Sequence, residues 1–454
     1  MIKILPLGGC DEIGASSIYL NIDGTGILLD CGIHPKKKGV ESLPKFSLLE
    51  PLPLDYVFIS HAHQDHIGAL PILIKKFPHL LIYTTTQTKE IANITMHNAV
   101  SIIEKEFRDE SLLLYTHEEI DLLIKAIIAV DYNDEIELKG LRHKSLEPIY
   151  INFLDAGHIL GAASILIRYK HKSVWYTGDI KTSPQRIMNG ARIPHHKIDT
   201  LITETTYGKI PVSKLPLLKD EEKRFLKEIN KIISQDGSVL VPVFALGKTQ
   251  EVLAIIDSLL KKGNLMDVPI YIGGVGVKIS QVYDKNRFVV NVRDKNFELK
   301  AIPHENFYDF NDPHHYKKKP GIVLAASGMM IEGTQSFKLA KYWLRQKDFG
   351  IFFVGYVDDE TPAFKILNSE PDEKIKLTEF SDEISRKCSV LKFQFPSHSN
   401  REEIFSLIKK TKPSQVVLVH GEDEARDWFG YNILKEYPNT KVYAPSTGAE
   451  IIIE

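Results

Sequence analysis

Four side chains that can bind a metal ion fall within six consecutive residues, His61 to His66 in the run Ser60-His61-Ala62-His63-Gln64-Asp65-His66. Neutral imidazoles together with a carboxylate suit Zn²⁺, which accepts both kinds of ligand. In an extended segment a spacing of two places His61 and His63 on the same side. Asp65 and His66 then reach a second position, so this one loop is able to supply ligands to two metal ions.

The elements expected around this loop are short strands and helices. The β-rich run 56–60 ends directly at the histidines, and residues 68–77 have a helical pattern. From about residue 206 helices and strands alternate, as in the buried-type strand 238–244 and the helix 248–262 after it. Such alternation is typical of βαβ units and a parallel sheet. The sequence therefore predicts an α/β (α+β) chain whose character changes near residue 206.

The composition narrows the class of protein. The chain has 454 residues, of which 43% are hydrophobic and 26% charged, as in a globular protein. Its net charge of −2 does not indicate a generally basic nucleic-acid binder, although a local groove matters more than the sum. Cys10, Cys31 and Cys388 form no CxxC pair, which favours a reducing, cytoplasmic setting. No run approaches the ~18–20 apolar residues of a membrane-spanning helix.

The HxHxDH pattern at 61–66 resembles that of the metallo-β-lactamase superfamily. The resemblance implies an αββα sandwich with a dinuclear metal site at the sheet edge. It also implies further ligands downstream, which match His158 in a glycine-flanked turn and Asp179 at a strand end. Asp30, after the strand 27–29, matches the early aspartate that usually braces the ligand loop.

A long α/β stretch after Asp179 resembles the β-CASP nucleases, which carry a domain inserted into this fold. Their three additional motifs match Glu204, His398 and His420, although Pro396 departs from the usual Phe-Ser-Ala-His around the middle histidine. Further segments are similar to the RNA 3′-end-processing branch, which includes the nuclease subunit of the cleavage and polyadenylation specificity factor and its archaeal and bacterial relatives. These segments are 30–35, 68–71, 243–247 and 327–330.

The resemblance implies a domain organisation. Residues 1–205 and 385–454 would form the metallo-β-lactamase domain in two parts. Residues 206–384 would form the inserted β-CASP domain, with the catalytic cleft between the two domains.

The implied ligands divide into two sets that share one carboxylate: His61, His63 and His158 for one zinc, Asp65, His66 and His420 for the other, and Asp179 for both. Two Zn²⁺ ions per chain are expected, with Mn²⁺ or Fe as alternatives. Two metals can share a hydroxide and clamp the phosphate oxygens of an in-line displacement. The catalytic residues would then be Asp65, His398 as general acid and Glu204 as its orienting partner.

The function that the resemblance implies is hydrolysis of RNA, leaving 3′-OH and 5′-phosphate ends. The 327–330 segment and the lack of a ribonuclease J-type tail and loop favour an endonuclease, and a 5′→3′ exoribonuclease remains open. So do a non-nuclease hydrolase of the superfamily and an inactive RNA-binding subunit. The partners expected are RNA and, beyond it, a second copy or an RNA-processing complex, without a membrane.

RNA-backbone contacts are predicted on the inserted domain. The candidates are Lys248, the run 317–319 that begins with Lys317, and the loop residues Ser327, Gly328 and Met329. The pairs at 195–196 and 314–315 are histidines in connecting stretches, and we interpret them as surface residues or RNA-backbone contacts rather than metal ligands.

Overall fold

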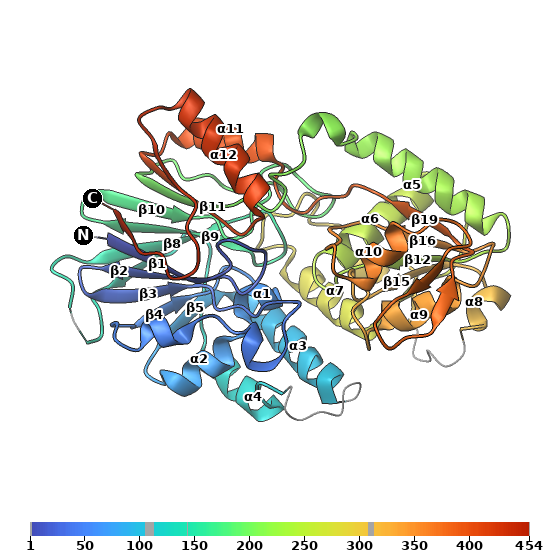
Figure 1. Cartoon of the computed structure of the whole chain (residues 1–454), viewed down its shortest axis with the longest axis horizontal. Coiled ribbons are helices and arrows are strands. Elements are labelled where there is room, and N and C mark those ends of the chain that lie inside the picture. The colour runs from blue at the N-terminus through green and yellow to red at the C-terminus, as the bar shows by residue number, and fades with distance from the viewer. Residues whose placement is uncertain (1, 105–112, 143, 307–312, 454) are drawn as a thin grey trace. The chain divides into compact units, whose positions relative to one another are not determined.

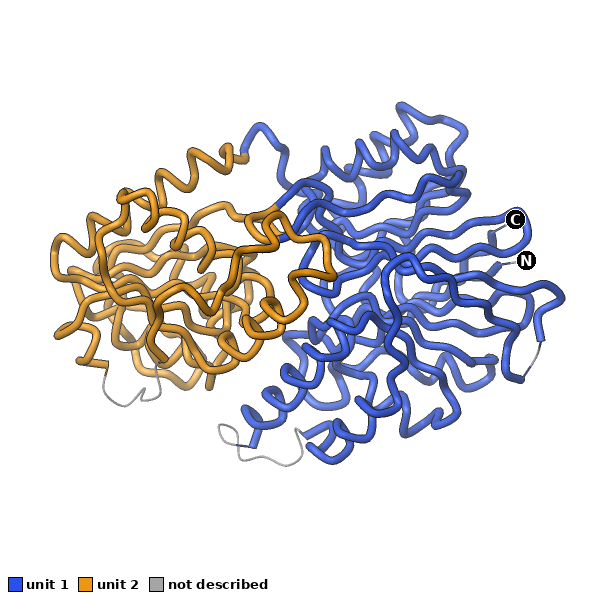
Figure 2. Tube along the Cα trace, turned by 180° about the vertical axis from the view of Figure 1, so that it is seen from behind, with its two compact units in different colours: residues 1–184, 188–214, 398–454 blue, residues 185–187, 215–397 orange. Residues whose placement is uncertain are grey.

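The computed structural model describes residues 2–104, 113–142, 144–306 and 313–453 (Figure 1). The chain divides into two compact units, coloured separately in Figure 2. Unit 1 comprises Met1–Pro184, Met188–Lys214 and His398–Glu454, and unit 2 comprises Gln185–Ile187 and Leu215–Ser397. No helix in these described ranges is long and apolar enough to cross a membrane.

The described residues of unit 1 form two seven-stranded sheets. The first has the order β22-β1-β2-β3-β4-β5-β6, with β1 (Ile2–Gly8), β2 (Ser17–Ile22), β3 (Thr25–Leu29), β4 (Tyr56–Phe58), β5 (Leu81–Thr85), β6 (Ile128–Val130) and β22 (Ile451–Ile453). The second has the order β21-β20-β11-β10-β9-β8-β7, with β7 (Glu135–Leu138), β8 (Ile149–Asp155), β9 (Ala163–Tyr169), β10 (Lys172–Tyr176), β11 (Thr200–Glu204), β20 (Gln415–Val419) and β21 (Lys441–Tyr443).

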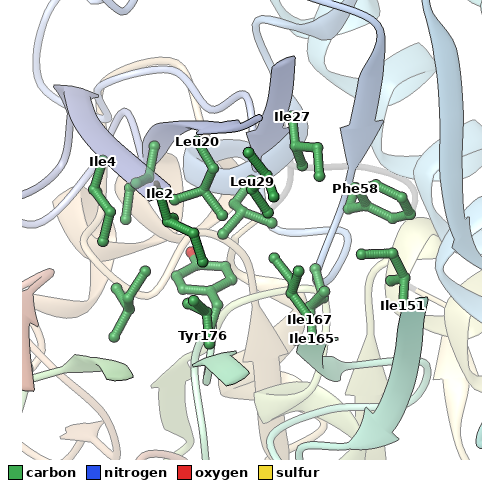
Figure 3. Packing of buried hydrophobic residues seen from close by; sticks show 14 of the residues in the cluster. Ile2, Ile4, Leu20, Ile27, Leu29, Phe58, Ile151, Ile165, Ile167 and Tyr176 are labelled. Atoms are coloured by element: carbon green, nitrogen blue, oxygen red, sulfur yellow. The ribbon is translucent and has the colours of Figure 1, made fainter. Parts of the chain in front are cut away.

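The core of unit 1 lies between these two sheets. Side chains alternate along a strand, so every second residue faces the opposite sheet. In β8, Ile151 is fully buried while its neighbours Tyr150 and Asn152 are half-buried. Figure 3 shows Leu29 and Phe58 of the first sheet facing Ile165 and others of the second. This burial of apolar side chains holds the sheets together.

Helices cover the outer faces of both sheets, which completes the predicted αββα sandwich. On the first sheet are α2 (Leu70–Lys76), α3 (Thr86–Ile102) and α4 (His117–Ala126), and on the second are α11 (Arg401–Thr411) and α12 (Asp423–Glu436) (Figure 1). The short helices η1 (Gly39–Ser42), η2 (Phe46–Leu49) and α1 (Gln64–Ile67) lie in loops. The sequence analysis did not anticipate α3, because few of its residues are apolar and these are interrupted by threonine and asparagine.

Unit 2 is an α/β layer, as the alternating pattern predicted. Its described residues form a six-stranded parallel sheet of order β14-β13-β15-β12-β16-β19, with β12 (Val239–Pro242), β13 (Ile270–Ile272), β14 (Glu305–Asn306), β15 (Ile322–Ala325), β16 (Gly350–Phe353) and β19 (Ser389–Lys392). A two-stranded sheet joins β17 (Lys374–Lys376) and β18 (Glu383–Ser385). The helices are α5 (Leu218–Ile233), α6 (Lys248–Lys261), α7 (Gly274–Asn286), α8 (His315–Lys318), α9 (Gln335–Trp343) and α10 (Pro362–Leu367), with η5 (Val212–Lys214) before them and η6 (Leu299–Ala301) after α7.

Apart from Gln185–Ile187, the chain passes between the two compact units at 214/215 and 397/398, whereas the predicted domain boundaries are 205/206 and 384/385. The strand β19 pairs in parallel with β16 in the sheet of unit 2, so the return to unit 1 comes at His398. The sequence of β19 fits either sheet, because both take a short apolar strand. Only the hydrogen bonds between β16 and β19 decide which sheet it joins.

Candidate metal centre

The candidate ligands of unit 1 lie at one edge of the sandwich because the strands that carry them end there. The strands β10, β11 and β20 are parallel neighbours, and β8 runs in the same direction as β10 because both are antiparallel to β9. Their carboxyl ends therefore meet at one edge. Glu204 is the last residue of β11. The ends of β8, β10 and β20 are followed shortly by His158, Asp179 and His420, respectively.

One group of ligand atoms gathers three imidazoles and a carboxylate. His63 Nδ1 lies 3.0 Å from His61 Nε2 and 3.3 Å from His158 Nε2. Asp179 Oδ2 lies 3.5 Å from His61 Nε2 and 3.7 Å from His158 Nε2. Ligand nitrogens around a tetrahedral zinc are about 3.3–3.4 Å apart, given bonds of about 2.0–2.1 Å. The spacing of these atoms thus suits a single ion.

A second group lies beside the first and contains Asp65, His66 and His420. Asp65 Oδ2 lies 3.4 Å from His420 Nε2 and 3.8 Å from His66 Nε2. The other oxygen of Asp179, Oδ1, lies 3.4 Å from His66 Nε2 and 3.3 Å from His420 Nδ1. The two oxygens of Asp179 therefore face different groups.

Three of the facing atoms lack a hydrogen-bond partner among the described residues: His66 Nε2, Asp179 Oδ1 and His420 Nε2. All three belong to buried side chains. Leaving a buried polar atom unpaired costs roughly 1–3 kcal/mol. A cation would satisfy these atoms together, so the donor set fits a metal ion.

Asp30 organises the loop that carries the histidines. Its Oδ2 accepts from His66 Nδ1 at 2.7 Å and from Tyr176 Oη at 2.7 Å, and its Oδ1 accepts from Ser60 N at 2.6 Å. With Nδ1 donating to Asp30, Nε2 is the nitrogen of His66 that faces Asp179 and Asp65, and it is the one that would bind a metal ion. Such carboxylate–histidine pairs orient metal ligands and raise their basicity. Asp30 thus has the bracing position that the resemblance implied.

The protonation states of the two groups differ. Burial lowers the pKa of His61 and His63, which keeps these imidazoles neutral. Burial would raise the pKa of Asp179, but His66 and His420 outweigh it and hold the pKa well below its usual range. For His66 burial would lower the pKa, but Asp179, Asp65 and Asp30 raise it well above the usual value. A metal bound at His66 would therefore displace a proton.

The sequence comparisons agree with this geometry. Three family models match the chain: a metallo-beta-lactamase superfamily domain over residues 19–207, a Beta-Casp domain over 249–366, and a Zn-dependent metallo-hydrolase RNA specificity domain over 383–445. The RNase J-like protein of Methanocaldococcus jannaschii is 32% identical over 418 residues, which cover 91% of each chain. This chain belongs to the β-CASP family of the metallo-β-lactamase superfamily.

Other β-CASP relatives are longer. The cleavage and polyadenylation specificity factor 73 of Drosophila melanogaster is 32% identical over 448 residues, covering 96% of this chain and 62% of the relative. The Integrator complex subunit 11 homolog of Dictyostelium discoideum is 31% identical and is covered over 61% of its length. The chain thus spans about three fifths of the length of these curated relatives.

Similarity to a solved structure supports the fold and nothing beyond the fold. A protein of unknown function from Enterococcus faecalis V583 superposes with a TM-score of 0.55 at 15% sequence identity, and all of both chains is covered.

The β-CASP motif residues Glu204 and His398 lie beside the first group. His398 Nδ1 is 3.0 Å from Glu204 Oε2 and 3.9 Å from Asp179 Oδ2. Glu204 is almost fully buried, and its Oε1 accepts from Ile180 N at 2.6 Å. The ring of Tyr207 stacks on His398 with centroids 5.8 Å apart. With Nδ1 donating to Glu204, a second proton on His398 would sit on Nε2.

The other predicted contact residues belong to unit 2. Lys248 is only 6% exposed, and its Nζ donates to the carbonyl of Phe395. In the described structure this lysine therefore joins α6 to the segment before His398, and its contact with an RNA backbone stays a prediction. The sequence did not reveal this burial because the spacing of apolar residues cannot show that a charged side chain is buried.

Lys317 and Lys318 of the lysine run end the helix α8, and Lys319 follows it, with its Nζ bonded to Glu305 at 2.5 Å. Ser327, Gly328 and Met329 lie in the loop after β15, where Ser327 Oγ accepts from Ile331 N. The histidine pairs 195–196 and 314–315 join no metal-type group of the described chain.

Two residues that bond to side chains of the candidate site were not predicted from the sequence. Thr206 Oγ1 lies 3.1 Å from His420 Nδ1, and Tyr176 bonds to Asp30. Thr206 lies in the same motif as Glu204, so its position two residues further on was the available signal. Nothing in the sequence around Tyr176 marks it.

Gly32 lets the metal-ligand loop pass close to the strand β3. A Cβ at this position would lie 1.7 Å from the carbonyl oxygen of Asp65. That carbonyl also accepts from Ser16 N at 2.8 Å, and Cys31 N donates to His66 O at 2.7 Å. The Asp65–His66 backbone therefore cannot move aside without breaking these bonds.

We expect Gly32→Ala to lower the free energy of unfolding by about 1–3 kcal/mol, because the added methyl group overpacks a rigid contact. The metal content should fall with it, since Asp65 and His66 would be displaced. Gly430→Ala, in α12 with open space around it, is the matched control and should stabilise the helix by up to about 1 kcal/mol. Thermal unfolding and elemental analysis of the two variants test this. Equal metal content and equal unfolding temperatures would contradict it.

Proposed function

We propose that this chain is a dinuclear-zinc ribonuclease that cuts RNA internally and leaves 3′-OH and 5′-phosphate ends. The observation that carries the proposal is the position of Asp179, whose two oxygens face separate groups of histidines while Glu204 and His398 lie alongside. This arrangement combines sites for two cations with a nearby proton donor. Hydrolysis of a phosphodiester needs both.

The ligands of each proposed ion follow from the two groups: His61, His63 and His158 for one, Asp65, His66 and His420 for the other, with Asp179 between them. Zinc suits the imidazole-rich set, and Mn²⁺ or Fe would replace it where those metals are more available. When bound, such a metal pair lowers the pKa of water toward ~7 and neutralises charge on the phosphate.

The residues of the chain supply the remaining steps. The carboxylate of Glu204 favours the protonated form of His398 and fixes its Nδ1. His398 then donates the proton of Nε2 to the leaving 3′-oxygen as the P–O3′ bond breaks. Asp65, next to His420 and His66, would serve as a ligand of the second ion. Water is the nucleophile, so the 2′-hydroxyl is not consumed, and the ends are 3′-OH and 5′-phosphate.

RNA is the proposed substrate because residues 383–445 match an RNA specificity domain and two M. jannaschii relatives are named as RNases. The names of the longer relatives include a cleavage and polyadenylation factor and an Integrator subunit. We therefore propose that this chain also works with other copies of itself or within an RNA-processing complex. The buried, unpaired cysteines fit a cytoplasmic location.

The substrate is tested by a time course on three molecules: a linear single-stranded RNA, its DNA counterpart and a circular RNA. We expect the linear and circular RNA to be cut and the DNA to stay largely intact, since a 2′-hydroxyl is available for recognition only in RNA. End-group analysis should find 3′-OH and 5′-phosphate. Equal cleavage of DNA would overturn the substrate class.

A 5′→3′ exoribonuclease is the second candidate, favoured by the 91% coverage of an RNase J-like relative. It would leave circular RNA intact and release mononucleotides from linear RNA. The internal mode proposed above depends on the resemblance at 327–330 to the 3′-end-processing branch, so the circular substrate decides between the two. An inactive subunit fits poorly, because every ligand position carries a ligand-type residue.

A further inference from the structure

Two histidine–lysine tripeptides from different parts of the sequence meet in a groove of unit 1. They are Lys170-His171-Lys172, at the turn between β9 and β10, and His195-His196-Lys197, before β11. The groove has a volume of about 610 Å³ and contains residues of both tripeptides, except His195. The rest of its lining comes from β8, β9 and the strand ends beside them: Glu147, Pro148, Tyr150, Arg168, Ser173 and Asp199.

Hydrogen bonds hold the two tripeptides in place. Ser173 N donates to Asp199 Oδ2 at 2.9 Å, and Ser173 Oγ donates to Lys197 O at 2.8 Å. In return Asp199 N donates to Ser173 Oγ at 3.0 Å. Immediately beyond, β10 and β11 pair in parallel from Val174 and Thr200. The groove is thus built on strand ends, which gives it a defined shape.

The lining is cationic in a chain of net charge −2. Arg168, Lys170, Lys172 and Lys197 contribute four positive charges, and two carboxylates, Glu147 and Asp199, oppose them. Asp199 accepts from Ser173 and also lies 3.4 Å from Lys197 Nζ, in an ion pair that leaves the side chain of Lys197 77% exposed. The groove therefore concentrates positive charge that the chain as a whole lacks, and such a groove attracts polyanions.

An aromatic ring lies within this charged surface. The guanidinium carbon of Arg168 is 5.8 Å from the centre of the Tyr150 ring, and Arg168 also bonds to Glu135 and Asn152. Guanidinium groups bind phosphates through paired hydrogen bonds, and tyrosine rings stack on bases. Each nucleotide of a nucleic-acid strand offers both kinds of partner, whereas an aspartate or glutamate side chain offers only the charge.

The groove is separate from the candidate metal centre. The strand β8 begins at the groove with Ile149 and ends at Asp155, three residues before His158. The strand β10 likewise begins with Lys172 and ends three residues before Asp179. Strands of this length extend about 17–23 Å at roughly 3.3 Å per residue. The two sites therefore lie at opposite ends of the second sheet.

We propose that this groove binds the phosphates of a single-stranded RNA, several nucleotides away from the bond that is cut. The inference rests on the proposed function for the identity of the polyanion, and on the groove alone for the binding. It adds to unit 1 a contact that extends the RNA-binding surface beyond the metal centre. Arg168, Lys170, Lys172 and Lys197 supply the charges that meet the phosphates.

The test replaces Lys170, Lys172 and Lys197 together by glutamine. Binding of a labelled 30-nucleotide single-stranded RNA is measured against salt concentration, with His398→Ala present in every protein so that cleavage does not interfere. We expect the affinity to fall at least about tenfold at low salt. The slope of log K against log salt should decrease by about 0.7 for each phosphate that is no longer neutralised, hence by about 2. The control is a triple variant of three exposed lysines of α11 and its end, Lys409→Gln, Lys410→Gln and Lys412→Gln, which should keep the slope.

An unchanged salt slope in the groove variant would overturn the proposal. So would displacement of the RNA by poly-glutamate at an equal concentration of charge, because that result would assign the groove to an acidic protein segment. Cleavage by the wild-type chain is measured separately. A wild-type chain that binds RNA through the groove but cuts none would refute the proposed ribonuclease and leave the groove inference standing.

Discussion

Asp179→Ala is expected to remove the metal from both groups at once, lowering the content from about two ions per chain to nearly none. The two oxygens of Asp179 face both histidine groups, at distances of 3.3–3.7 Å from the ring nitrogens of His61, His66, His158 and His420. The proposed activity should fall roughly 10³-fold or more, since metal catalysis supplies several kcal/mol. Elemental analysis of the purified variant and a cleavage assay measure both effects.

Variants of one group at a time serve as controls. His158→Ala touches only the first group and His420→Ala only the second, so each should lose about one ion. Asp30→Asn keeps all ligands but weakens the hold on His66, and should lower metal affinity about 10–100-fold. A wild-type chain with a single tightly held ion, or an Asp179→Ala variant with normal metal content, would contradict the dinuclear centre.

His398→Ala is expected to keep both metals and the affinity for RNA while losing about 10²–10⁴-fold in the rate of cleavage. The reason is that His398 lies beside the metal groups, 3.9 Å from Asp179, with its Nδ1 bonded to Glu204. Loss of a proton donor slows departure of the 3′-oxygen without disturbing the ligands. Single-turnover kinetics, metal analysis and RNA binding separate these effects.

Glu204→Gln is the companion variant, since glutamine keeps an acceptor for Ile180 N but removes the charge. We expect a smaller loss in rate, and an alkaline limb of the pH–rate profile that moves to lower pH. The direction follows because an imidazolium without a neighbouring carboxylate loses its proton more easily. Loss of metal in His398→Ala would reassign that histidine as a ligand, a role that its grouping with Asp179 and Glu204 also allows.

Local patterns in the sequence were sufficient for much of the fold. Apolar runs between turns predicted the strands at 27–29 and 56–60, and the second was placed directly before the histidines, where β4 is found. The α/β rhythm after residue 206 is confirmed by the parallel sheet of unit 2. The helix α3 and the membership of β19 were not predictable, because the first has weak amphipathic contrast and the second depends on its partner strand.

For the candidate site, the sequence by itself determined which residues have the chemistry of ligands, because residue type and local spacing are sufficient to identify His61, His63, Asp65 and His66. Only the tertiary structure decided how distant residues join them. Glu204 and Val419 are register partners in parallel strands more than 200 positions apart, and this pairing brings His420 to the site. The tertiary structure also decided that Asp179 faces both histidine groups, that Lys248 is buried, and that the two histidine–lysine tripeptides share one groove. The physical reason is that contacts between segments remote in sequence fix side-chain orientation and burial, which no local pattern records.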